Sequence, residues 1–218
     1  MECFYIVTVA WVFSVCLHEF GHAWIAYKGG DFTVKEKGYF TLNPLKYTDP
    51  VQSIVLPLVF VIIGGFGLPG GAVYIDRSLL RSRKWQTAVS LAGPAMNLVF
   101  VIIIGALFRF RVIQSDPASL ASVSLAFLLY LQVSAILLNL LPIPPLDGFQ
   151  AIAPWLPESV RAQGYANATV AQFALLVGLC FVPPVSHAFW GIVLSVTDWL
   201  GVERMLIGVG WRTYQFWK

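Results

Sequence analysis

Six stretches of apolar residues, separated by short polar segments, make up most of the chain. The continuous stretches lack the two-residue alternation of apolar and polar positions that a strand of a membrane β-barrel would show. Only helices and closed barrels satisfy their backbone hydrogen bonds in lipid, so the pattern predicts an all-α membrane protein, a polytopic transmembrane helical bundle. The expected segments are residues 3–27, 51–68, 87–108, 120–141, 170–183 and 185–202.

The second stretch, residues 51–68, is interrupted by prolines and glycines, and the loops on both sides of it are basic. Positively charged loops stay on the cytoplasmic side, so both loops can lie there only if this segment does not cross. We therefore expect a re-entrant or half-inserted loop, with a short kinked span as the alternative. The charges are Lys28, Lys35, Lys37 and Lys46 before the segment and Arg77, Arg81, Arg83 and Lys84 after it.

The last two stretches meet at Pro183 and Pro184, which predicts a helical hairpin over about residues 170–202. This hairpin would return the tail, with Arg204 and Arg212, to the side of the basic loops. No stretch remains for a soluble domain, so residues 1–218 are expected to form a single integral membrane domain with a core at about residues 1–150.

The composition agrees with a multi-pass protein of a plasma or organelle membrane. Apolar residues make up 58% of the chain and charged residues 11%, against about 25% charged residues in soluble domains. The mean hydropathy is +0.74. The net charge of +3 is carried by loops, which fits the bias of cytoplasmic loops and excludes a nucleic-acid surface as its explanation.

The sequence His18-Glu19-Phe20-Gly21-His22 ends an apolar run that has no charged residue from Phe4 to Leu17. Two histidines four residues apart lie about 40° apart around a helix, so both imidazoles can meet one metal ion. Glu19 between them can polarise a metal-bound water. Ionisable side chains are costly in lipid, which argues against a chance match. The alternative is a pair of interfacial histidines bonded to headgroups or backbone.

A hydrolytic zinc site takes three protein ligands and leaves a fourth position open for water. Asp147 follows the proline cluster at the inner end of the fourth span and is the best placed third ligand, although an Asp before Gly is also a common turn residue. Asp116 falls in a loop on the opposite side, and Asp198 lies near the far end of the chain, where both are expected to be solvated or interfacial. Asn97, in the third span, is either an interhelical hydrogen-bonding residue or an amide aimed at the substrate carbonyl, and both interpretations stay open.

Three motifs, HEFGH, AGPAMN and PIPPLDG, occur in this order between about residues 10 and 150. Together they resemble the site-2 protease family of intramembrane zinc metalloproteases, in its compact form without PDZ-like or CBS-like domains. The resemblance implies that His18, His22 and Asp147 bind one zinc ion and that Glu19 is the catalytic acid and base. It also implies that Asn97 positions the substrate or stabilises the oxyanion.

The resemblance therefore implies a zinc-dependent endopeptidase that cleaves transmembrane protein substrates within the lipid bilayer. A transmembrane substrate must unwind before its carbonyls can be attacked, and the Phe32 to Leu42 stretch could offer it a β-like strand edge. The alternatives are a metal-ion transporter, which usually shows internal repeats that this chain lacks, and a catalytically silent membrane adaptor, which would not need Glu19.

Overall fold

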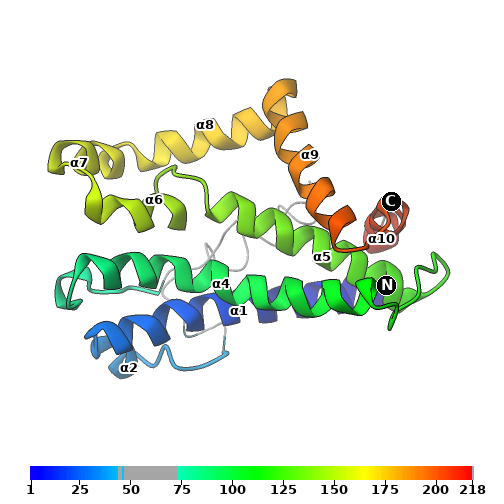
Figure 1. The fold of residues 1–218 in the computed structure, drawn as a ribbon, viewed down its shortest axis with the longest axis horizontal. Coiled ribbons are helices and arrows are strands. Elements are labelled where there is room, and N and C mark those ends of the chain that lie inside the picture. Colours follow the sequence, from blue (N-terminus) through cyan, green and yellow to red (C-terminus); the bar gives the residue numbers. More distant parts are fainter. Residues whose placement is uncertain (44–45, 47–72, 218) are drawn as a thin grey trace.

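The computed structural model of the protein describes residues 1–43, 46 and 73–217, and within these ranges every regular element is a helix (Figure 1). The expected re-entrant segment, residues 51–68, lies outside the described residues. The elements are α1 (Glu2–Gly29), α2 (Thr33–Glu36), η3 (Arg77–Leu79), α4 (Arg83–Arg109), α5 (Leu120–Asn139), α6 (Asp147–Ile152), η4 (Ala153–Trp155), α7 (Glu158–Ala166), α8 (Ala168–Phe181), α9 (Pro183–Trp199) and α10 (Arg204–Tyr214).

Among the described residues, α1, α4 and α5 are each long and apolar enough to cross a membrane. The pair α7 and α8 passes the same test together, although the two helices are bent by 65° relative to each other. The long helices coincide with the apolar stretches 3–27, 87–108 and 120–141. The predicted all-α membrane bundle is therefore confirmed.

The interior of the bundle forms where α1, α4 and α5 pack together. Val7, Val101 and Phe127, one from each helix, are at most 3% exposed. A polar contact crosses this apolar interior, because Nε2 of Gln132 on α5 donates to the Ser14 hydroxyl on α1 at 2.6 Å. Such a bond between membrane helices stabilises their association by roughly 0.6–2 kcal/mol and helps to set their register.

The end of α1 adjoins the start of α4. α1 ends at Gly29 and is capped by Gly30, whose φ of +119° lies in the left-handed region that favours glycine. The backbone N–H of Asp31 then donates to the Ala26 carbonyl at 3.0 Å. The backbone N–H of Arg81 donates to the carbonyl of Gly29 at 2.9 Å. The two basic loops therefore lie at the same end of the bundle, as their charges predicted.

Residues 32–42 do not form the expected strand edge, so that prediction is wrong. They contain the short helix α2 followed by turns. The buried carboxylate of Asp31 starts the helical turn, because its Oδ1 accepts from the backbone N–H of Thr33 at 3.1 Å and from the Thr33 hydroxyl at 2.6 Å. Its Oδ2 accepts from Asp76 N at 2.8 Å, which joins this turn to the segment before α4.

The C-terminal tail lies at the opposite end of the bundle from the basic loops, so its predicted position is also wrong. Both chain ends are drawn side by side in Figure 1, and the Tyr214 ring lies 5.2 Å from that of Phe4 at the start of α1. The buried face of α10, with Leu206 and Gly210, packs against the first turns of α5. Burial of this apolar face outweighs the preference of the tail's few charges for the other side.

Candidate metal centre

Two histidines of α1 form one side of the candidate site. His18 and His22 are each 7% exposed, and their four-residue spacing places them on one face of the helix. Nδ1 of His22 donates to the Val89 carbonyl of α4 at 2.7 Å. A carbonyl can only accept, so the proton of the neutral ring lies on Nδ1 and the lone pair on Nε2 is free for a metal ion. That Nε2 lies 3.0 Å from Nε2 of His18.

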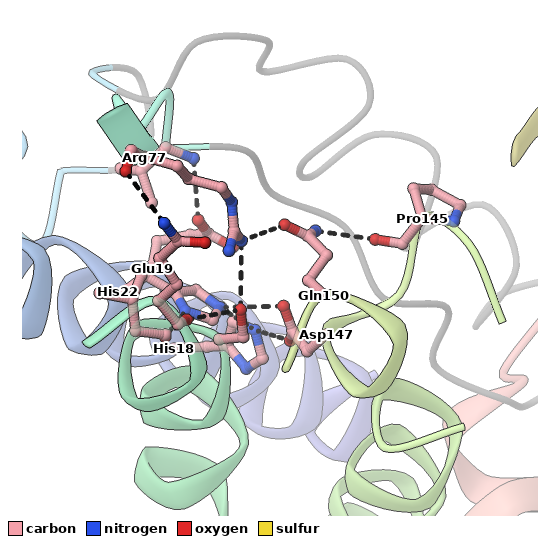
Figure 2. A network of polar contacts seen from close by, with 11 residues as sticks. His18, Glu19, His22, Arg77, Pro145, Asp147 and Gln150 are labelled. Carbon is pink, nitrogen blue, oxygen red and sulfur yellow. Dashed lines mark hydrogen bonds and ion pairs between the residues drawn. The ribbon is translucent and has the colours of Figure 1, made fainter. Parts of the chain in front are cut away.

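Asp147 is brought to the histidines by a sharp return of the chain after α5. The helix ends at Asn139, the proline-rich segment follows, and Asp147 is the first residue of α6. Gly148 permits this return, because a Cβ at that position would overlap the carbonyl oxygen of Leu140. Oδ2 of Asp147 lies 3.1 Å from Nε2 of His18, and Oδ1 lies 3.5 Å from Nε2 of His22 (Figure 2).

The three side chains fit one zinc ion. Their ligand atoms all lie within 4.8 Å of one another, and no other group of this kind occurs in residues 1–43, 46 and 73–217. Around a tetrahedral zinc ion with bonds of about 2.1 Å, two ligand atoms lie about 3.4 Å apart. The two Nε2 atoms lie 3.0 Å apart, and different oxygens of Asp147 lie 3.1 Å from that of His18 and 3.5 Å from that of His22, so each of these separations is close to that edge length. The structure thus brings together the three candidate ligands that were expected from the sequence.

Gly93 on α4 makes room for the histidine pair. A Cβ at this position would overlap Nε2 of both His22 and His18. The neighbouring contact of the two helices is equally close, because a Cβ at Gly21 would lie 2.8 Å from the carbonyl oxygen of Ala92. The small residues of the third span therefore allow α4 to approach the side of α1 that carries the ligands.

Glu19 lies beside the three ligands without belonging to their group. Its side chain is 3% exposed, and its Oε2 accepts a hydrogen bond from the backbone N–H of Val73 at 3.0 Å. Val73 belongs to the segment without regular secondary structure that precedes η3. This bond fixes the orientation of a buried carboxylate next to the metal ligands, where a general base would be needed.

Arg77 joins the elements around the site (Figure 2). Its Nη2 donates to the Ser90 hydroxyl of α4 at 3.1 Å and to Oε1 of Gln150 on α6. Burial lowers the pKa of the Arg77 guanidinium below its ordinary value, and the negative charge of Asp147 opposes that shift. An arginine keeps its proton in proteins, so a positive charge lies next to the candidate metal centre.

Comparisons with known proteins agree with this chemistry. The sequence model of peptidase family M50 matches residues 6–115. A relative from Mycolicibacterium smegmatis, named zinc metalloprotease Rip2, is 44% identical over 99% of this chain and 82% of its own length. The Rip2 protein of Mycobacterium tuberculosis is 41% identical over the same shares. The chain belongs to peptidase family M50.

Membership of family M50 confirms the resemblance to the site-2 proteases and the prediction of a membrane-embedded protease. A further relative, named zinc metalloprotease YwhC from Bacillus subtilis, is 32% identical over 88% of this chain and 87% of its own length. Zinc, the metal in these names, is also the one that the donor set was expected to hold. No relative named here is a transporter or an adaptor, and no solved structure matches the chain.

Asn97, the remaining candidate in this M50 chain, lies one helical turn after Gly93 on α4. Its side chain is 5% exposed, and its Oδ1 is buried without a hydrogen-bond partner in the described part of the chain. The two other acids lie away from the metal centre. Asp116 accepts from Ala118 N at 2.9 Å, and Asp198 pairs with Arg204 at 2.6 Å.

Several contacts around the M50 site were not predicted from the sequence. The backbone groups of Val73 and Val89 carry no sequence signal, because every residue has an N–H or a carbonyl to offer. Gly93 belongs to the AGPAMN motif, which does not by itself indicate that this glycine faces the histidines. Gln150 could have been identified from the sequence, because it is a polar side chain one turn after Asp147 in an otherwise apolar segment.

Proposed function

We propose that this protein is a zinc-dependent intramembrane endopeptidase that cleaves transmembrane segments of membrane proteins. His18, His22 and Asp147 bind one zinc ion, and Glu19 acts as the general base. The observation that carries the proposal is the grouping of three ligand atoms within 4.8 Å beside a buried glutamate. Residues 1–218 form a single protease domain that crosses a plasma or organelle membrane several times.

The zinc ion and the side chains of the protein have different roles in the proposed reaction. Bound zinc supplies a Lewis acid that polarises the scissile carbonyl and lowers the pKa of a water molecule. Glu19 accepts a proton from that water as it attacks, and later donates the proton to the leaving amine. The backbone N–H of Val73 donates to Oε2 of Glu19 at 3.0 Å, which orients the carboxylate for these transfers.

Asn97 is proposed to position the substrate carbonyl or to stabilise the oxyanion through its amide. The support is a buried amide one turn beyond the glycine that faces both histidines. A carbonyl in an intact transmembrane helix is already hydrogen-bonded, so the substrate must unwind locally before these groups can reach it. The amide N–H then replaces part of the hydrogen bonding that the carbonyl loses.

The test is cleavage of a generic transmembrane substrate by the purified protein in detergent. Native protein, native protein after chelation, and chelated protein with zinc restored are compared with the variant Glu19→Gln. We expect cleavage in the native and restored samples, none after chelation, and a loss of about 100- to 10,000-fold in Glu19→Gln. The variant should still bind one zinc ion. Cleavage that survives both chelation and Glu19→Gln would refute the mechanism.

A further inference from the structure

The contacts of Arg77 connect three elements that surround the metal ligands (Figure 2). The residue itself lies in η3, its Nη2 reaches Ser90 on α4, and the same nitrogen reaches Gln150 on α6. The Ser90 hydroxyl donates onward to the carbonyl of Gln86 at 3.1 Å, so it is available as an acceptor for the guanidinium. The guanidinium therefore holds α6 against α4.

Gln150 also forms a hydrogen bond with the segment that contains Asp147. It lies three residues after Asp147 on the same short helix, and its Nε2 donates to the carbonyl of Pro145 at 2.8 Å. The side chain of Gln150 thus spans the stretch from Pro145 to its own turn, with Asp147 between them. A helix of six residues is too short to be stable by itself, so external contacts must hold it in place.

Asp147 has little tolerance for displacement. Its two oxygens lie 3.1 and 3.5 Å from Nε2 of His18 and His22, and ligand distances at a zinc ion vary by only about 0.2 Å. A shift of α6 along α4 by the length of one bond would remove the carboxylate from the ligand set. The contact of Thr87 with Ala151, at 2.7 Å, holds the far end of α6 but not the turn that bears Asp147.

We propose that Arg77 is a positioning residue of the metal centre: through Gln150 it holds the first turn of α6 so that Asp147 stays in the ligand set. The inference rests on the proposed zinc site and adds a residue to it. Arginine suits this place because the planar guanidinium fixes the directions of the two N–H bonds of Nη2, whereas the N–H bonds of a lysine ammonium rotate.

The test measures the zinc affinity of the full chain in detergent by competition with a chromophoric chelator. We expect Arg77→Met to weaken zinc binding by about 10- to 100-fold, as the loss of groups that orient metal ligands does in other sites. Gln150→Leu should weaken it to a similar degree. The double variant should be no weaker than either single one, because both changes break the same connection.

A second measurement separates positioning from substrate binding. If Arg77 acts through Asp147, excess zinc should restore cleavage by Arg77→Met to near the native rate, with an unchanged KM. A raised KM that excess zinc does not correct would overturn the proposal. So would native zinc affinity in Arg77→Met, or additive losses in the double variant.

The controls keep this inference apart from the proposed function. Arg204→Met breaks an ion pair with Asp198 far from the ligands, and its zinc affinity should equal that of the native chain. Failure of the native protein itself to bind zinc would refute the zinc site, whereas native binding that Arg77→Met shares refutes only the role of Arg77. Should Arg77→Met not fold, as judged by thermal unfolding of the metal-free protein, Gln150→Leu carries the same test.

Discussion

Replacing Gly93 by alanine tests whether the close approach of α4 to α1 sets the metal site. The added methyl group would lie closer than 3.0 Å to Nε2 of both His22 and His18. Overpacking costs about 1–3 kcal/mol, while alanine gains about 1 kcal/mol over glycine within a helix. The imidazoles are the groups that must move, so the cost falls on metal binding and corresponds to an affinity about 5- to 150-fold weaker.

The assay is competition for zinc with a chromophoric chelator, alongside thermal unfolding of the metal-free protein. We expect weaker zinc binding in Gly93→Ala and a free energy of unfolding changed by no more than about 2 kcal/mol, because the helix gain offsets part of the strain. Gly191→Ala is the matched control, since a Cβ there meets nothing within 4 Å. Native zinc affinity in Gly93→Ala would refute the reasoning.

Three further predictions concern stability in detergent. Ser14→Ala should lower the free energy of unfolding by about 1–3 kcal/mol, because it leaves the buried Gln132 amide without its acceptor, whereas Gln132→Leu should be nearly neutral. Gly210→Ala should cost about 1–3 kcal/mol, because its Cβ would overlap a backbone carbonyl of α5, and Gly208→Ala, in open space, should cost nothing. Zinc at about 1,000 times its Kd should stabilise the native chain by about 4 kcal/mol, an effect that Asp147→Asn should largely remove. Chemical or thermal unfolding checks all three predictions. Equal stability within either pair of variants, or equal stabilisation of Asp147→Asn and the native chain by zinc, would contradict them.

The close packing around Gly93 leaves the polar side chains of the candidate site buried. His18, His22 and Glu19 are each at most 7% exposed, although all three are polar groups within a membrane helix. Carbonyl and N–H groups of the chain satisfy two of them, at Val89 and Val73. These partners offset the cost of burying polar groups in an apolar setting.

Two expectations failed for reasons that lie in contacts between distant segments. The strand edge at residues 32–42 was expected in a stretch that has apolar residues among lysines, but the Asp31 carboxylate accepts hydrogen bonds from Thr33 and Asp76 and directs the chain into a helical turn. The position of the tail was inferred from its charges, but Tyr214 and its neighbours pack on the far end of α1. In both cases burial and side-chain bonding outweighed a surface preference.

The apolar runs and motifs of the chain were enough to predict a membrane environment, the helices and a zinc metalloprotease. Long apolar runs allow only helices in lipid, and the spacing of His18 and His22 places two imidazoles on one face because a helix repeats every 3.6 residues. The separation of Asp147 from that motif by more than 120 positions has no such local rule. Its place opposite the histidines was decided by the tertiary structure: the packing of α4 on α1 at Gly93, the return of the chain at Gly148, and the bonds of Gln150. Local periodicity is encoded in neighbouring residues, whereas the distance between two helices depends on every side chain between them.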